Sequence, residues 1–189
     1  MRRYTMKIAI RAISISLFFL MAGVGQSPAD SPQLFSGVVD SVIDGDLIRV
    51  TLDEGQKIPE AYKTCSKVYA TMAWVRLFAI KANDPLKKQQ PCGKEAKEFV
   101  KRLAQGRRVI VDVTGCPPDG GLGGVVTVED GMIASKDLNL ELVKAGLARV
   151  GSAGSETNRA GLVGKYYAAE KKAMMDGLGL WGKKPCGKK

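Results

Sequence analysis

The chain of 189 residues contains no histidine. This absence excludes Ser-His-Asp and Cys-His nucleophilic catalysis, and it excludes every zinc site that needs a histidine ligand. The sequence also lacks C-x-x-C spacing, which argues against zinc-ribbon and thioredoxin-like sites. Catalysis or binding must therefore depend on carboxylates, arginine, lysine and backbone groups.

Long apolar runs are also scarce. The run at residues 12–24 has 13 residues, fewer than the roughly 20 that span a bilayer. Basic residues precede it, and Ser27-Pro28-Ala29 fits a small-x-small cleavage pattern, with a cut after Gly25 as the alternative. We therefore expect residues 1–29 to be a signal peptide and the chain to be exported, to the periplasm or out of the cell. An uncleaved signal anchor is the rival interpretation.

Acidic residues are fewer than basic ones, with 19 Asp and Glu against 29 Lys and Arg. The formal net charge is +10, and the expected leader accounts for four of the basic residues and none of the acidic ones. The mature chain therefore stays basic, which favours anionic partners such as nucleic acid or an anionic membrane surface. A soluble basic protein without such a partner explains the charge equally well.

The four cysteines are Cys65, Cys92, Cys116 and Cys186. An even number of cysteines in an exported chain predicts disulfides. Two bridges allow three connectivities. We favour Cys65–Cys92 with Cys116–Cys186, because the first pair flanks one predicted strand.

Hydrophobic periodicity predicts a small α+β domain over residues 30–182. Its predicted strands are 35–43, 47–52, 73–80, 107–113, 125–128 and a short one at 147–150, and its predicted helices are 92–105, 137–145 and one from about 162 to 177. Residues 53–72 are polar and irregular and are expected to form an inserted loop. Residues 183–189 are expected to form a basic tail. The order of elements favours a five-stranded sheet or barrel.

Five blocks resemble the staphylococcal nuclease (thermonuclease) family, and they occur in the family's order. They are Ile43-Asp44-Gly45-Asp46, the strand and loop 76–84, the helix start 92–99, the run 137–148 and the closing segment 168–181. This resemblance implies an OB-fold five-stranded β-barrel with three helices. It also implies metal-dependent cleavage of phosphodiesters as the ancestral activity.

The resemblance assigns site roles to three residues. At two further site positions this chain departs from the family. In the family, two aspartates hold calcium, a glutamate acts on water and two arginines hold the phosphate. Asp46 matches the first metal ligand, Arg76 the first arginine and Asp84 the position of the general base. Lys81 stands at the second metal-ligand position, where it is expected to repel a cation and to pair with Asp46. Leu122 stands at the second arginine.

These departures predict a protein that has lost most or all of its calcium-dependent nuclease activity. Residues 151–154 also lack the aromatic side chains that line the base pocket in the family. We therefore expect no cofactor, and calcium only if the site works. The alternative is an active secreted metal-dependent endonuclease of DNA or RNA with a modified site, in which Asp44 or Glu95 completes the metal ligands.

A non-catalytic binding module would use a basic surface. The candidates are Lys87, Lys88, Lys94, Lys97 and Lys101, three of which follow helical spacing. Such a surface would bind nucleic acid without sequence preference and with a strong dependence on salt. An ordinary solvated helix face explains the same pattern. A partner protein in the cell envelope, contacted through residues 53–72, is the third possibility, and a monomer is expected.

Overall fold

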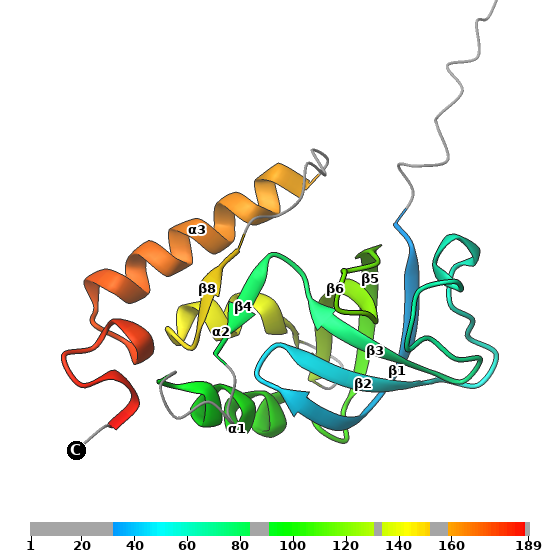
Figure 1. Cartoon of the computed structure of the whole chain (residues 1–189), viewed down its shortest axis with the longest axis horizontal. Helices are drawn as coiled ribbons and strands as arrows, with labels where there is room; N and C mark the ends of the chain where they lie inside the picture. The colour runs from blue at the N-terminus through cyan, green and yellow to red at the C-terminus, as the bar shows by residue number, and fades with distance from the viewer. Residues whose placement is uncertain (1–31, 84–90, 131–133, 152–158, 188–189) are drawn as a thin grey trace, which may run out of the picture. The chain divides into compact units, whose positions relative to one another are not determined.

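Five strands close into a barrel in the computed structural model, which describes residues 32–83, 91–130, 134–151 and 159–187. The strands are β1 (Leu34–Asp44), β2 (Leu47–Leu52), β3 (Met72–Leu77), β5 (Arg108–Gly115) and β6 (Leu122–Asp130). They pair antiparallel in the order β3-β2-β1-β5-β6, and a parallel pairing of β3 with β6 closes the ring (Figure 1). The predicted five-stranded OB-type barrel is therefore confirmed.

Buried and partly exposed residues alternate along the strands, and this alternation explains why the sheet closes into a barrel. In β3, Ala73, Val75 and Leu77 are buried while the residues between them are only partly covered. In β5, Val109, Val111 and Val113 are buried in the same alternating way. Because successive side chains point to opposite faces, each strand presents one apolar face, and the barrel interior collects these faces.

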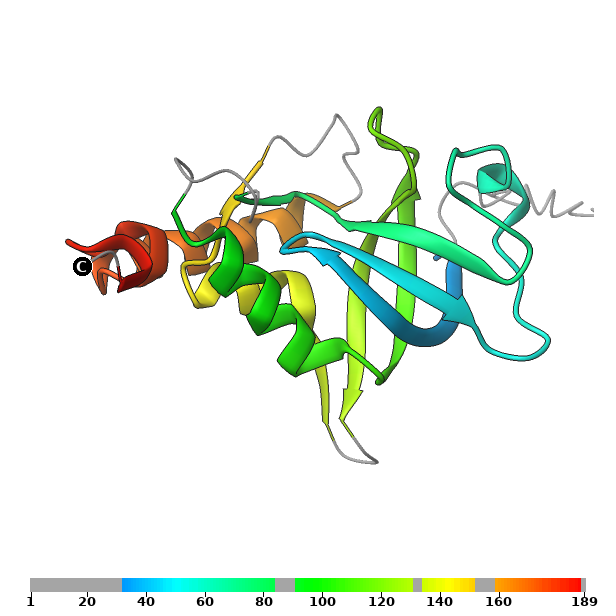
Figure 2. The ribbon, with the colours of Figure 1, turned by 60° about the horizontal axis from the view of Figure 1, so that its bottom comes forward.

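The remaining elements extend and cover the barrel. They are β7 (Ala134–Asp137), which pairs with β6; a small sheet of β4 (Ile80–Ala82) and β8 (Ala148–Val150); the helices α1 (Gly93–Ala104), α2 (Leu138–Lys144) and α3 (Ala160–Met175); and the short 3₁₀ turns η2 (Glu60–Tyr62), η4 (Gly179–Trp181) and η5 (Pro185–Gly187). The two views show α2 and β8 lying alongside α3 (Figure 2), and packing contacts join α3 to both. The three predicted helices are confirmed. No helix of the described residues is long and apolar enough to cross a membrane.

Two predicted strands differ from the structure. The strand predicted at 73–80 is broken after Leu77, and Ala79 adopts a left-handed φ of 58° before the chain continues as β4. The strand predicted at 125–128 begins earlier, at Leu122, because residues 122–124 pair with β3. Glycines are rare inside strands, so Gly123 and Gly124 did not indicate a strand in the sequence. A Cβ at Gly124 would lie 2.8 Å from the Val111 side chain, so this position requires glycine for close packing.

The turn between β1 and β2 also requires its glycine for packing. A Cβ on Gly45 would lie 2.7 Å from the Cβ atoms of both Ala82 and Ala96. The turn is therefore wedged between β4 and α1, and small residues on all three elements permit this approach. This packing fixes the position of Asp46, the next residue.

Helices α2 and α3 are tied together by Asp137 and Tyr166. The Asp137 side chain caps α2 by accepting a hydrogen bond from the Leu140 amide at 2.9 Å. The fully buried Tyr166 donates its hydroxyl proton to the other carboxylate oxygen at 3.0 Å. Burial raises the pKa of Asp137 above its ordinary value, and the hydrogen bonds from Leu140 and Tyr166 oppose this rise.

We expect Tyr166→Phe to lower the free energy of unfolding by about 1–2 kcal/mol near neutral pH, because Asp137 loses a donor. The tyrosine hydroxyl favours the charged carboxylate, so its removal raises the folded-state pKa of Asp137 further. The loss of unfolding free energy is therefore largest above the pKa that Asp137 has in the folded variant. It shrinks as the pH falls through that pKa and the carboxyl protonates. Urea unfolding of both proteins between about pH 3 and 7 measures this trend, and a cost that grows towards acid pH would contradict it.

The disulfide pairing favoured from the sequence is wrong. The bridges are Cys65–Cys116 and Cys92–Cys186, with Cα–Cα distances of 5.6 and 5.1 Å. Cys65 precedes β3 and Cys116 precedes β6, and the parallel pairing of these strands brings the two cysteines together. Long-range strand pairing, which spacing along the chain does not reveal, decided this connectivity.

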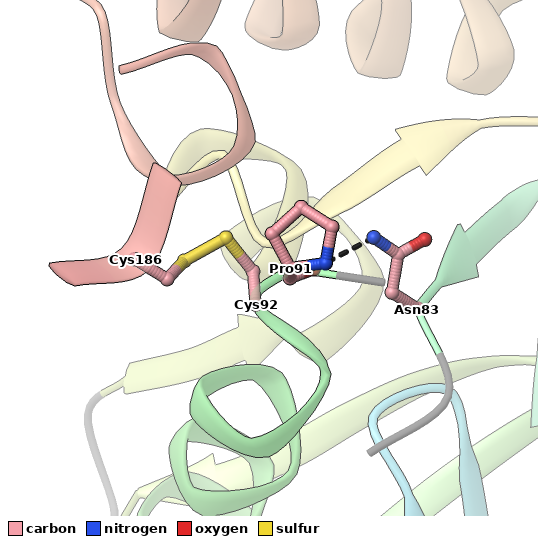
Figure 3. Close-up of a disulfide and its surroundings, with 4 residues drawn as sticks. All are labelled: Asn83, Pro91, Cys92 and Cys186. Carbon is pink, nitrogen blue, oxygen red and sulfur yellow. Dashed lines mark hydrogen bonds between the residues drawn. A yellow bond between two sulfur atoms is a disulfide. The ribbon is translucent and has the colours of Figure 1, made fainter. Parts of the chain in front are cut away.

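The second bridge joins the start of α1 to the C-terminal segment. Cys92 lies just before α1 and bonds to Cys186 in η5 (Figure 3). Beside it, the Asn83 side-chain amide donates to the Pro91 carbonyl at 2.7 Å, so the two ends of segment 84–90 are held together. The basic tail predicted from residue 183 therefore begins in a segment that is anchored covalently.

Candidate functional site

Asp46 is the first predicted site residue, and it lies directly after the wedged turn. Its side chain is 95% buried, and its own carbonyl accepts from the Leu77 amide at 2.9 Å. The adjacent register pairs Leu47 with Arg76. Strand pairing therefore places Asp46 beside Arg76, which the family resemblance assigns to phosphate binding.

Both oxygens of the Asp46 carboxylate accept hydrogen bonds from protein groups. One oxygen accepts from the Arg76 guanidinium at 3.1 Å, and the other accepts from the Ala82 amide at 3.1 Å. Burial raises the pKa of Asp46, while the charge of Arg76 and the Ala82 hydrogen bond act in the opposite direction. The carboxylate thus serves here as a buried ion-pair partner.

Lys81 does not pair directly with Asp46, contrary to the expectation. It is exposed on β4, and it acts on the Asp46 carboxyl through its field, which lowers that pKa. Its cross-strand neighbour on β8 is Arg149, which lies over the Trp181 ring at 5.0 Å. Directly opposed residues lie about 5 Å apart, so two cations stand together at this edge.

Asp119 is a site residue that the sequence interpretation missed. Its carboxylate lies 3.3 Å from the Arg76 guanidinium, on a different nitrogen from the one that binds Asp46. Asp119 follows Pro117-Pro118 in the loop before β6. Arg76 therefore lies between two carboxylates.

The loop that carries Asp119 is fixed by the inserted segment 53–72. Cys65 bonds to Cys116, and the Gly121 amide donates to the Ser66 carbonyl at 2.8 Å. The Lys67 ammonium donates to the Asp119 carbonyl at 3.2 Å and lies over the Trp74 ring at 4.8 Å. The insertion thus supports one wall of the site.

The structure places the Leu122 side chain away from the surface of the site. It is fully buried in β6 and belongs to the barrel core, while its neighbour Gly123 lines the pocket beside Arg76. The side chain at position 122 therefore faces the barrel core and not the pocket. At the pocket surface this part of the chain contributes glycine and Asp119.

A pocket of about 430 Å³ lies over these residues. Asp46, Arg76, Lys81 and Asp119 line it together with Phe78, Thr114 and the Pro117-Pro118 segment. Phe78 supplies an aromatic side chain that the sequence analysis did not assign to the site. The Arg76 Nε–H is buried and lacks a hydrogen-bond partner among the described residues.

The donor set does not fit calcium. Calcium takes six to eight oxygen ligands, commonly from several carboxylates. Within residues 32–83, 91–130, 134–151 and 159–187, no group of three acidic or cysteine side chains converges on a point. Asp46 already faces Arg76, and Lys81 stands where the resemblance expects an anion. Asp84, the expected base, lies outside the described residues.

The predicted basic surface is only partly described. Lys87 and Lys88 lie outside the described residues, whereas Lys94, Lys97 and Lys101 lie on one side of α1. Glu98 lies among them and pairs with Lys101 at 3.0 Å. None of these three lysines lines the pocket.

Comparisons with known proteins agree with this fold. The family model described as staphylococcal nuclease homologue matches residues 74–183, more than half of the chain. A protein of Pyricularia oryzae named probable endonuclease LCL3 is 39% identical over 95 residues, which are 50% of this chain and 37% of that protein. The protein of the same name from Phaeosphaeria nodorum is 34% identical over 97 residues, 51% of this chain and 32% of that protein.

The match thus spans about a third of the length of these relatives. The matched part of this chain includes Arg76, Lys81 and Asp119, and it excludes the Asp46 turn and the whole insertion 53–72. With the closed barrel and its three helices, the family match shows that the chain belongs to the staphylococcal nuclease family.

Proposed function

We propose that this protein is an exported member of the family that binds nucleic-acid phosphates at the Arg76 pocket and has lost most or all of its calcium-dependent cleavage. The observation that carries the proposal is the engagement of Asp46 by Arg76 and the Ala82 amide, with Lys81 at the second ligand position. A divalent cation bound to Asp46 would have to displace the Arg76 guanidinium and tolerate the charge of Lys81.

The pocket suits an anionic group better than a cation. Arg76 and the exposed Lys81 line it, and the exposed Arg149 is the cross-strand neighbour of Lys81. Phosphate oxygens are the natural acceptors for such donors, and Phe78 offers a ring on which a base can stack. The binding would be backbone-led and independent of sequence.

Export is supported by two observations. Residues 1–29 have the pattern of a signal peptide, and the described residues hold both disulfides and no free cysteine. Disulfides of this kind form in oxidising compartments.

A working endonuclease is the second candidate. It is favoured by the family match, by relatives named probable endonucleases, and by the adjacency of Asp46 and Arg76. In this case Asp84 would act on the water, and a metal other than calcium, held by ligands that differ from those of the family, would be required.

A cleavage assay separates the two candidates. We expect the purified, oxidised protein to leave single-stranded DNA and RNA intact in calcium, magnesium or manganese, as it does in EDTA. An Asp46→Ala, Arg76→Ala double variant measures contamination by other nucleases. Metal-dependent cleavage that disappears in this variant would overturn the loss of activity and establish the second candidate.

Binding is tested with Lys81→Gln, because Lys81 is exposed and its replacement leaves the core intact. Fluorescence anisotropy with single-stranded DNA at low salt is expected to show about 3- to 10-fold weaker binding, with the salt slope reduced by about one. Lys57→Gln, an exposed lysine outside the pocket lining, is the matched control. Equal losses in both variants, or no binding by the parent protein, would contradict a role for the pocket.

A further inference from the structure

Arg76 forms ion pairs with two carboxylates that differ in how firmly they are held. The Asp46 side chain is only 5% exposed, and its second oxygen is fixed by the Ala82 amide at 3.1 Å. The Asp119 side chain is 65% exposed, and its carboxylate contacts Arg76 at 3.3 Å. Of the two carboxylates, Asp119 is therefore the one that an incoming anion can displace.

Asp119 occupies the part of Arg76 that a phosphate in the pocket would use. Both residues line the pocket, together with Pro117-Pro118 from the same loop. The two terminal nitrogens of the guanidinium are divided between the carboxylates, since Nη1 faces Asp46 and Nη2 faces Asp119. A phosphate that enters the pocket must therefore displace Asp119 from Nη2 or lie beside a like charge.

The backbone around Asp119 is held by the inserted segment 53–72. Cys116, three residues before Asp119, bonds to Cys65, and the Asp119 carbonyl accepts from the Lys67 ammonium at 3.2 Å. Figure 2 shows the loop between β5 and β6 beside this segment. The insertion therefore keeps the Asp119 side chain within reach of Arg76, although that side chain is itself exposed.

We propose that Asp119 is an internal competitor for the phosphate at Arg76, and that the Cys65–Cys116 bridge controls this competition by holding the loop in place. Carboxylate and phosphate oxygens accept from the same guanidinium N–H groups, so the two anions compete for Nη2. The inference rests on the proposed function of the pocket. It adds the residue that limits the affinity of the pocket and the covalent link that keeps this residue in position.

The size of the effect follows from the charge of Asp119. Two unit charges about 4 Å apart change an equilibrium about fivefold in water, and a partly enclosed site increases this factor. Removal of the Asp119 charge should therefore strengthen phosphate binding about 5- to 20-fold. Loss of the Cys65–Cys116 bridge should strengthen it less, about 2- to 5-fold, because the loop then leaves Arg76 for only part of the time.

Fluorescence anisotropy with labelled single-stranded DNA at low salt tests the competition. Asp119→Asn should bind about 5- to 20-fold more tightly than the parent protein. Glu54→Gln removes the same charge from an exposed residue outside the pocket lining, and it should strengthen binding by less than about twofold. If the parent binds and Asp119→Asn gains no more than this control, the inference is wrong and the proposed function stands. Absence of binding by all three proteins would overturn both.

Bridge variants that unfold cooperatively in urea test the control by the bridge. Cys65→Ala with Cys116→Ser should bind the DNA about 2- to 5-fold more tightly than the parent, and it should add nothing in the Asp119→Asn background, where the competitor is already absent. Cys92→Ala with Cys186→Ser opens the other bridge and should leave the affinity unchanged within about twofold. No gain from the first pair, equal gains from both pairs, or a gain that persists in the Asp119→Asn background would overturn the role of the bridge.

Discussion

Asn139→Ala is expected to lower the free energy of unfolding by about 3–5 kcal/mol. The Asn139 side chain is fully buried and makes three hydrogen bonds to backbone. It accepts from the Val126 amide at 3.1 Å and donates to the Phe78 and Gly124 carbonyls at 3.0 and 3.2 Å. Each buried group left without a partner costs about 1–3 kcal/mol, and a cavity adds to this.

Urea unfolding followed by circular dichroism measures the loss. Glu141→Gln is the matched control on the same helix: Glu141 pairs with Lys144 at 2.8 Å in a partly exposed pair, and its loss should cost no more than about 0.5 kcal/mol. The Asn139 bonds also hold Phe78, where β3 ends and the chain turns towards Lys81. We therefore expect the alanine variant to bind single-stranded DNA more weakly even when it is folded. A loss of stability below about 1 kcal/mol would show that the three bonds together contribute little to stability.

Cys186→Ser is expected to cost about 2–5 kcal/mol, because it opens a bridge between cysteines 94 residues apart in sequence. The unfolded chain gains the conformational freedom of a long loop, and this gain lowers the free energy of unfolding. In the folded state, η5 loses its covalent link to the start of α1. Denaturant unfolding in the absence of reductant is the measurement.

Two comparisons isolate the bridge. A Cys92→Ala, Cys186→Ser double variant should be about as stable as the single variant, because the first substitution already removes the bond. Addition of reductant should destabilise the parent protein more than either variant, since the parent alone has this bridge to lose. A single variant as stable as the parent, or a double variant that costs much more than the single, would contradict a stabilising role for the bridge.

Much of the fold was readable from local patterns. Strands β1, β2 and β5 have regular alternation or apolar runs, and α1 has the spacing of an amphipathic helix ended near Gly106. Asp46 and Arg76 were assigned to one site through the family resemblance, and the pairing of β2 with β3 brings them together. Local sequence is informative here because the interactions that shape these elements join residues that are close along the chain.

Other features depend on contacts between distant segments. The parallel pairing of β3 with β6 joins residues more than 40 positions apart, and it brings Cys65 to Cys116. The same pairing carries Asp119 to Arg76 and buries Leu122 in the core rather than at the pocket. No periodicity in residues 115–124 indicates this, because glycine and proline are compatible with a loop and with a closely packed strand alike.

The amino-acid sequence alone thus specified a basic, histidine-free chain, an OB-type barrel and the replacement of an expected metal ligand by Lys81. These features follow from composition, from motifs and from hydrophobic periodicity, which depends on residues close together along the chain. Tertiary structure decided the disulfide partners, the enclosure of Arg76 by two carboxylates, and the three-bond role of Asn139. It also decided which side of α3 is left uncovered. These properties arise from the closure of the barrel and the packing of helices, and such contacts exist only when segments far apart in the sequence meet.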